Sequence, residues 1–189
     1  LVAGCGPEAD PEPTAYETIR AAPNRDTDSA RSLYEEANEL VREDQLQQAE
    51  EKLKAALSAD IFFGPAHNDL GIVYLRTNRY YLAAWEFQYA SKLMPDRREP
   101  LHNLGMVYEE VGRFDEAARW YEKALERAPE SGEVAGSLAR AQIRSNDVTQ
   151  QTLELLQKVV MRHPDPHWVQ WAREESALLA PQVASEPSD

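Results

Sequence analysis

The sequence predicts an all-α protein, because three observations point to packed helices and away from a β-sheet. The chain of 189 residues contains only 8 glycines and 4 phenylalanines, and it has few of the β-branched runs that sandwiches and barrels need. Hydrophobic residues make up 42% of the sequence, which is too many for a wholly disordered chain. Small and apolar residues also recur at a fixed step of 34 residues.

This repeat is clearest in the middle of the chain. Seven pairs of positions keep the same step: Leu70 and Leu104, Gly71 and Gly105, Tyr74 and Tyr108, Ala83 and Ala117, Phe87 and Tyr121, Ala90 and Ala124, and Pro95 and Pro129. Seven coincidences at a single period leave little room for chance. A single helical hairpin cannot bury its apolar face, so the repeat predicts a stack of hairpins.

The register continues in both directions. Toward the N-terminus, the equivalent positions hold Ala37, Leu40, Ala49, Leu53 and Ala56. Toward the C-terminus, Leu138 and Ala139 keep the step of 34, and one residue inserted near residues 149–152 then brings into step Leu156, Val159 and Pro164. We therefore predict four units, at residues 30–63, 64–97, 98–131 and 132–166.

The succession of Leu-Gly, Tyr, Ala, Phe, Ala and Pro resembles the tetratricopeptide repeat. The resemblance implies a right-handed superhelical α-solenoid of helix–turn–helix units. The small residues Gly71, Gly105, Ala37 and Ala139 are expected to let the first helix approach the second, where Ala49, Ala83 and Ala117 face it. The aromatic residues are expected to fill the spaces between successive hairpins: Tyr74, Phe87, Tyr108 and Tyr121. Three residues that tolerate the left-handed conformation are expected to end the first helices: Asn78, Gly112 and Asn146.

A capping helix is expected at residues 167–180, followed by a polar tail at residues 181–189. One helical face there would carry Trp168, Trp171, Ala172, Leu178 and Leu179. A terminal repeat needs a lid with a polar outside, which favours capping, and the two tryptophans could instead form a hot spot for a partner.

The first residues, Leu1-Val2-Ala3-Gly4-Cys5-Gly6, resemble a bacterial lipobox. The resemblance implies that residues 1–4 end a lipoprotein signal peptide and that Cys5 carries covalent lipid, with Gly6 favouring export to the outer membrane. Residues 5–29 are expected to form an acidic, proline-rich tether, with a short helix at Thr14–Ala22 through Tyr16 and Ile19. The alternative is an accidental stretch of small residues.

Composition and motifs disfavour several other functions. The net charge of −13 and the lack of a basic patch argue against nucleic acid, and no apolar run is long enough to span a membrane. The sequence lacks a P-loop and the common hydrolase motifs, and prolines separate His163 from His167, so no metal site is expected. Glu109 and Glu110 are adjacent on one helix, so their side chains point ~100° apart and do not form a pair suited to acid–base chemistry. We expect no enzyme, no cofactor and no small-molecule substrate.

The resemblance places a concave groove along the first helix of each unit. The partner-binding residues it implies are Asn38, Val41, Arg42, Asn68, Ile72, Leu75, Arg76, His102, Met106, Glu109, Glu110, Arg140 and Ile143. An apolar strip would run along Val41, Ile72, Leu75, Met106 and Ile143, which suits an extended or helical peptide. The alternative is that neighbouring hairpins, or the protein's own arm, cover these side chains.

The members of this family that bind chaperone tails use a carboxylate clamp, which this sequence lacks in part. Tyr34 replaces the first lysine of the clamp, and the third unit carries Glu99 and Asn103, although Asn38 remains. The sequence instead resembles tetratricopeptide lipoproteins that serve as pilotins or as adaptors of cell-wall hydrolases. We expect an anchored scaffold in the periplasm; the alternatives are a stoichiometric subunit of a large assembly and a soluble intracellular protein.

Overall fold

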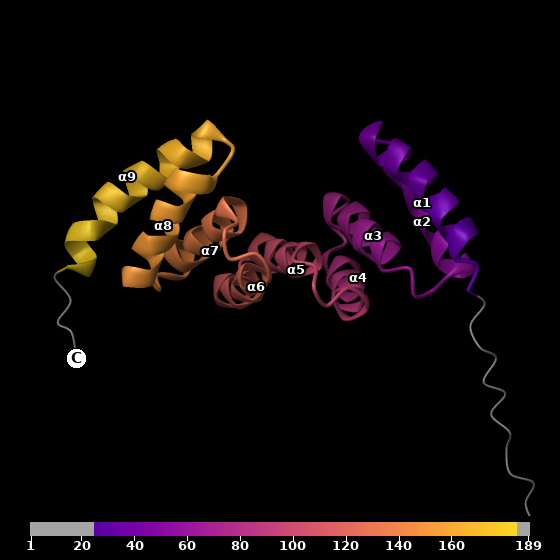
Figure 1. Ribbon diagram of the computed structural model, residues 1–189, viewed down its shortest axis with the longest axis horizontal. Coiled ribbons are helices and arrows are strands. Elements are labelled where there is room, and N and C mark those ends of the chain that lie inside the picture. The colour runs from indigo at the N-terminus through magenta and orange to yellow at the C-terminus, as the bar shows by residue number, and fades with distance from the viewer. Residues whose placement is uncertain (1–24, 185–189) are drawn as a thin grey trace, which may run out of the picture.

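The computed structural model describes residues 25–184, which form nine α-helices in a curved array (Figure 1). This confirms the all-α prediction. The helices are α1 (Thr27–Arg42), α2 (Leu46–Ala59), α3 (Gly64–Arg76), α4 (Tyr80–Leu93), α5 (Glu99–Glu110), α6 (Phe114–Arg127), α7 (Gly132–Ser145), α8 (Gln150–Arg162) and α9 (Pro166–Val183).

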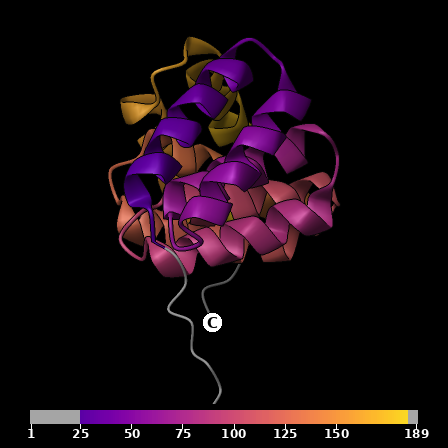
Figure 2. The same ribbon diagram turned by 90° about the vertical axis from the view of Figure 1, so that its right-hand side faces the viewer.

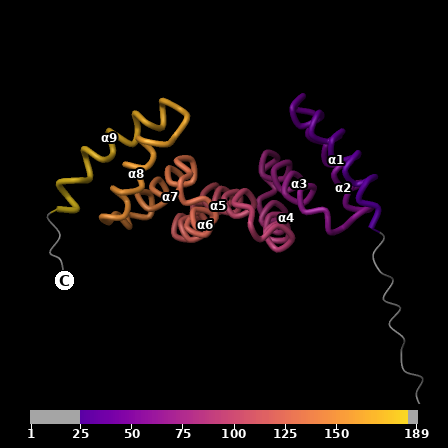
Figure 3. The backbone as a smooth tube through the Cα atoms, viewed as in Figure 1, coloured from indigo at the N-terminus to yellow at the C-terminus, as the bar shows by residue number. Residues whose placement is uncertain are grey.

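Each helix packs mainly on its neighbours along the chain, so the fold is a row of hairpins. Seen from the end, α1 and α2 lie side by side in front of the later hairpins (Figure 2). The backbone tube in Figure 3 shows α3, α5 and α7 on the inner side of the curve and α4 and α6 on its outer side. The first helices of the hairpins therefore line the concave surface.

A residue in the left-handed backbone conformation follows the first helix of every hairpin. Asn78, Gly112 and Asn146 have φ values of 58°, 75° and 60°, which confirms the three predicted turns. Asp44, with φ of 61°, takes the same role after α1 and was not predicted. Aspartate tolerates this region better than most residues, so its position in the repeat could have revealed it.

The fourth hairpin has a longer turn than the others. Three residues join the two helices of each of the first three hairpins, whereas residues 146–149 join α7 to α8. The inserted residue therefore lies just before α8, at the start of the interval that the sequence indicated. Thr149 and Thr152 close the turn, because each side chain bonds to the other's backbone N–H in a capping box.

The aromatic residues of the second helices pack inside their own hairpins. A Cβ atom on Gly71 would lie 2.6 Å from Cε1 of Phe87, and one on Gly105 would lie 2.4 Å from Cε1 of Tyr121. These two rings therefore occupy the space that the glycines leave inside each hairpin, and each ring also belongs to a core cluster with side chains of the next hairpin. Tyr108 also acts between hairpins, because it packs against both of the larger core clusters.

The helical boundaries differ from the predicted ones at both ends. Asp26 caps α1 by accepting the backbone N–H of Ser29 (3.1 Å), so the helix begins inside the expected tether. At the other end, α9 continues beyond residue 180, because the N–H of Ala184 donates to the carbonyl of Ala180 (3.1 Å) across Pro181. Leu178 is 64% exposed, so its predicted place on the packed face is wrong.

Several expectations fall outside the described residues. They are the lipid attachment at Cys5, the short helix at Thr14–Ala22 and the last five residues of the tail. No helix among residues 25–184 has the length and apolar character that crossing a bilayer requires.

Candidate partner-binding groove

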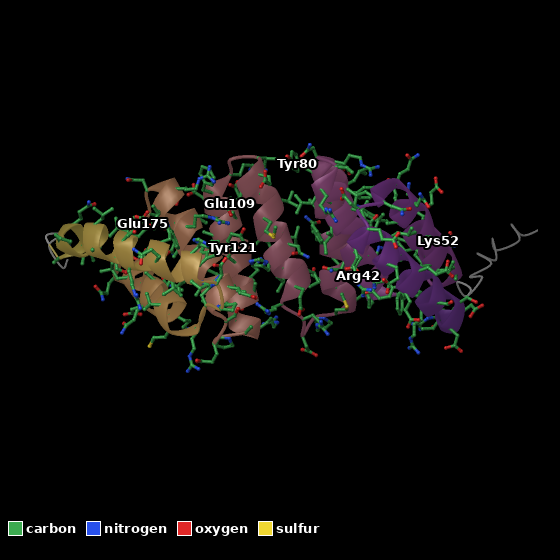
Figure 4. The ribbon with its side chains drawn as sticks, turned by 90° about the horizontal axis from the view of Figure 1, so that it is seen from above. Arg42, Lys52, Tyr80, Glu109, Tyr121 and Glu175 are labelled. Atoms are coloured by element: carbon green, nitrogen blue, oxygen red, sulfur yellow. The ribbon has the colours of Figure 1, made fainter. Side chains whose placement is uncertain are left out.

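The concave surface is lined by α1, α3, α5 and α7, and Figure 4 looks into it from above. The predicted apolar strip lies on these helices, but most of it is shielded. Val41, Ile72 and Leu75 are half-buried against the first core cluster, and Ile143 is half-buried against the second. Only Met106 is substantially open, at 37% exposure. The strip is therefore mainly structural, with one exposed aliphatic position near its centre.

Polar contacts join α1 to α3 at one end of the groove. The Arg76 guanidinium donates to the carboxylate of Asp44 (2.6 Å) and to the carbonyl of Val41 (3.4 Å). Arg42 instead pairs with Glu39 on its own helix. Arg76, expected to face a partner, thus partly serves the contact between the first two hairpins, although its side chain remains 40% exposed.

Amide side chains join α3 to α5 in the middle of the groove. The Asn103 amide donates to the side-chain oxygen of Asn68 (3.0 Å), and Asn68 donates to Asp69 (2.9 Å). Burial raises the pKa of the Asp69 carboxyl, which the Asn68 hydrogen bond partly offsets. Asn38, on α1, is half-buried. The Asn103–Asn68 hydrogen bond therefore joins α3 to α5.

A buried carboxylate joins α5 to α7. Glu109 is 8% exposed and accepts from Arg140 Nε (2.7 Å), Arg140 Nη2 (3.0 Å) and the hydroxyl of Tyr121 (2.9 Å). Arg144 approaches the same carboxylate at 3.5 Å. Burial, with the neighbouring Glu109 charge, raises the pKa of the Tyr121 phenol, which therefore keeps its proton and donates. Sequence analysis treated Glu109 and Glu110 alike, but only Glu110 is exposed.

His102 forms a second contact between α5 and α7. Its Nε2 lies 3.0 Å from the hydroxyl oxygen of Ser137, and burial together with the Arg98 charge lowers its pKa to about 4. The ring is therefore neutral near pH 7 and acts as a structural hydrogen-bonding group. Because most of the His102 ring is buried, little of it is available for the partner contact that the sequence predicted.

Two adjoining hollows remain open beside these contacts, and both include Arg140. One, of about 340 Å³, is lined by Met106, Glu109, Glu110, Arg140 and Arg144. The other, of about 330 Å³, is lined by Arg140, Asp165, His167, Trp168 and Trp171. The Arg140 guanidinium lies 4.7 Å from the centroid of the Trp168 ring, so it stands between a mainly charged hollow that contains Met106 and an aromatic one.

Sequence analysis missed the part that α9 plays in this surface. A Cβ atom on Gly136 would lie 2.9 Å from Cε3 of Trp168, so the α9 tryptophan covers the position where α5 carries His102. The glycine at this groove position was a signal that another side chain fills the space. His163 stacks on Trp168 with ring centroids 5.2 Å apart, and its Nδ1 accepts the backbone N–H of Asp165. No group of three or more potential metal ligands occurs within residues 25–184.

Comparisons with known families agree with this architecture. Two family models, both described as tetratricopeptide repeat, match residues 34–96 and 98–131. The chain is therefore a tetratricopeptide repeat protein. No curated protein matches it at a significant level.

Three solved structures show the same fold. MamA (residues 41 to the end) from Desulfovibrio magneticus RS-1 has a TM-score of 0.67 and 18% identity, covering 84% of this chain and 92% of that one. YrrB, described as a TPR protein with an unusual peptide-binding site, has a TM-score of 0.65 and 23% identity, covering 79% and 76%. The first TPR of Spaghetti (RPAP3), bound to the HSP90 peptide SRMEEVD, has a TM-score of 0.63 and 19% identity, covering 65% and 98%.

Proposed function

We propose that this protein is a non-catalytic scaffold that binds a segment of a partner protein along its concave surface. The observation that carries the proposal is the hollow lined by the exposed Met106 side chain, by Glu110 and by the guanidinium groups of Arg140 and Arg144. An aliphatic contact supplies affinity and flanking charges of both signs fix the direction of a bound segment. The solved relatives YrrB and RPAP3 are described with peptide sites, which supports the same use of the fold.

The surrounding contacts favour binding without a large rearrangement. The hydrogen bonds from Asn103 to Asn68 and from Arg140 to Glu109 tie consecutive first helices together before any partner arrives. A surface that is already ordered loses less conformational freedom on binding. We therefore expect the partner segment to order itself on a fixed groove.

A double substitution in the groove tests this function. Ile72→Glu with Met106→Glu places two carboxylates on the apolar strip and should remove the partner, and circular dichroism checks that the double variant is folded, because Ile72 is half-buried against the core. Proteins that copurify in detergent from native membranes would be quantified by mass spectrometry. Met161→Glu is the matched control, because Met161 is 65% exposed on α8 and distant in the repeat from the groove positions. Retention of the same companions by the folded double variant would contradict the groove.

We further propose that Cys5 carries lipid and holds the scaffold at the bacterial envelope, with the repeats in the periplasm and the outer membrane as the site of attachment. The proposal rests on the lipobox-like residues Leu1–Gly6. Anchoring would raise the effective concentration of a membrane partner and so strengthen weak groove contacts. Cys5→Ser should move the protein from the membrane fraction to the soluble fraction, as measured by fractionation and by the intact mass of Cys5 peptides. Continued membrane retention would show that lipid is not the sole anchor.

The partner is not expected to be a chaperone tail. Glu99 is bonded to Arg97 (3.0 Å and 3.2 Å), and Asn103 is bonded to Asn68, so neither is arranged as a cationic clamp. A peptide that ends in Glu-Glu-Val-Asp should not bind in a calorimetric titration.

A second candidate is a stoichiometric subunit of a large assembly that uses the outer face. It is favoured by the exposure of Tyr81 (83%) and Trp85 (55%) on α4. Copurification at a fixed ratio, independent of the groove substitutions, would support this candidate. An unmodified Cys5 would instead support a soluble intracellular protein.

A further inference from the structure

A hollow outside the groove lies between α2 and α4. It has a volume of about 650 Å³, and α3 forms its floor with His67, Leu70 and Tyr74. Ile61 and Trp85 stand at its rim and are 46% and 55% exposed. A hollow of this size with apolar walls is large enough to receive one or two bulky side chains. We call it the α2–α4 hollow.

The floor of the α2–α4 hollow contains a buried polar pair. His67 is 3% exposed and Glu86 is 8% exposed, and Nδ1 of the ring lies 2.6 Å from Oε2 of the carboxylate. The other ring nitrogen, Nε2, lies 2.8 Å from the carbonyl oxygen of Ile61. Both ring nitrogens lie within hydrogen-bond distance of an oxygen atom, so the ring is held between Glu86 and the carbonyl of Ile61. The Glu86 side chain also lines the hollow.

This polar pair is a departure from the repeat. In the third unit, 34 residues later, Leu101 occupies the position of His67 and Trp120 occupies the position of Glu86. Trp120 packs against two core clusters and stacks on Tyr108 with ring centroids 6.4 Å apart. The third unit thus places a large ring where the second unit has a carboxylate. The equivalent place between α4 and α6 therefore holds a tryptophan ring, whereas a smaller hollow of about 400 Å³ lies two periods on, between α6 and α8.

The described chain begins at the edge of this hollow. Arg25 forms an antiparallel bridge with Asp60, the residue before Ile61, and the N–H of Asp26 donates to the carbonyl of Ala59 (3.0 Å). The Arg25 guanidinium lies 5.1 Å from the centroid of the Phe62 ring. Arg25, the first described residue, therefore lies beside the segment 60–62, and the carbonyl oxygen of Ile61 in this segment lies 2.8 Å from Nε2 of His67.

We propose that the segment Thr14–Ala22 of this chain, which lies outside the described residues, occupies the α2–α4 hollow. Tyr16 and Ile19 are three residues apart, so a helical segment presents both on one face. The Tyr16 ring matches the apolar walls, and its hydroxyl can donate to Glu86 at the floor. Only Pro23 and Asn24 separate the segment from Arg25, so its effective concentration at the hollow is high.

One consequence rests on the proposed lipid anchor. With Thr14–Ala22 docked, only residues 6–13 remain as a spacer after Cys5, which reach about 30 Å when extended, against about 70 Å for the whole interval to Arg25. The α2–α4 hollow would then face the membrane, and the groove would open away from it toward a periplasmic partner.

Disulfide trapping tests the docking without the lipid. In a Cys5→Ser background, Ile19→Cys is combined with Ser58→Cys, a lining residue of the hollow. The matched control combines Ile19→Cys with Lys92→Cys, because Lys92 lies one period after Ser58 and is also exposed. Oxidation under native conditions, followed by mass spectrometry, should give an intrachain disulfide at least five-fold more often with Ser58→Cys. A third variant adds His67→Leu and Glu86→Trp, which copies the residues of the third unit and should bring the yield to the control level.

Each result decides the proposal. Intrachain trapping at the Ser58 position that the His67→Leu and Glu86→Trp pair removes would support it. Equal yields at the two positions in folded protein would overturn it, as would disulfides that form only between two chains, which would assign the hollow to a second copy. The experiment contains no lipid, so its failure leaves the groove and the anchor to be judged by their own tests.

Discussion

The second and third units have the same backbone but opposite distributions of polar residues. In the second unit, the buried polar pair is His67 with Glu86, at the floor of the α2–α4 hollow. In the third unit, the buried polar pair is Glu109 with Tyr121, beside the groove. The position of Glu109 is occupied by Leu75 in the second unit.

Within each hairpin, both members of a polar pair are replaced together. Where Leu75 replaces the carboxylate, Phe87 replaces the tyrosine, so no hydroxyl is left without an acceptor. Where Trp120 replaces the carboxylate of the second unit, Leu101 replaces the histidine. The comparison teaches that the repeat fixes which positions are buried, while paired substitutions decide which face of the hairpin carries a polar site.

The largest expected effect comes from making the third unit resemble the second. Glu109→Leu should lower the free energy of unfolding by about 3 kcal/mol, because Arg140 and the Tyr121 hydroxyl lose their buried acceptor. Adding Tyr121→Phe should recover about 1 kcal/mol, since the orphaned hydroxyl is removed. Urea unfolding followed by circular dichroism measures both values. Additive effects of the two substitutions would show that the pair is not coupled.

A smaller loss of stability is expected when the two glycines that face the aromatic rings are replaced by alanine, and the loss should differ between them. Gly105→Ala should cost about 2 to 3 kcal/mol, because the new methyl group meets Tyr121, whose hydroxyl bond to Glu109 resists a shift. Gly71→Ala meets Phe87, which has no hydroxyl to hold it, and should cost about 1 kcal/mol less. Thermal unfolding of the two variants makes the comparison, and the reverse order would exclude the Glu109 bond as the cause.

The smallest effect near neutral pH concerns His102, whose counterpart in the second unit is Asn68. The folded-state pKa of His102 is about 4, below the value of 6.5 for a free histidine, so the unfolded chain takes up its proton first as pH falls. The contribution of neutral His102 to the free energy of unfolding is complete above pH 6.5 and is lost between pH 6.5 and pH 4. At pH 5 the loss amounts to about 2 kcal/mol.

His102→Asn should flatten this part of the profile. Urea unfolding at pH 7, 6 and 5 would be compared for the variant, the parent protein and the control His167→Asn on the exposed start of α9. An unchanged slope in the His102→Asn variant would assign the acid sensitivity to other groups.

Sequence alone predicted the helical array and most of its turns. The step of 34 residues located the hairpins, and Asn78, Gly112 and Asn146 marked turns that the structure contains. It succeeded because helix pairing and left-handed turns are local requirements that recur in each unit. The candidate groove was predicted less completely, since burial of Ile72 and Leu75 depends on the neighbouring hairpins.

The sequence by itself determined the fold class, the repeat and the side of each first helix that faces the concave surface. The tertiary structure decided which of those side chains remain available. It paired Glu109 with Arg140 across 31 residues, laid Trp168 over Gly136, and left a hollow beside His67 and Glu86. The physical reason is that periodicity reports contacts common to all units, whereas the Glu109–Arg140 pair and the packing of Trp168 on Gly136 depend on side chains that only one unit contains.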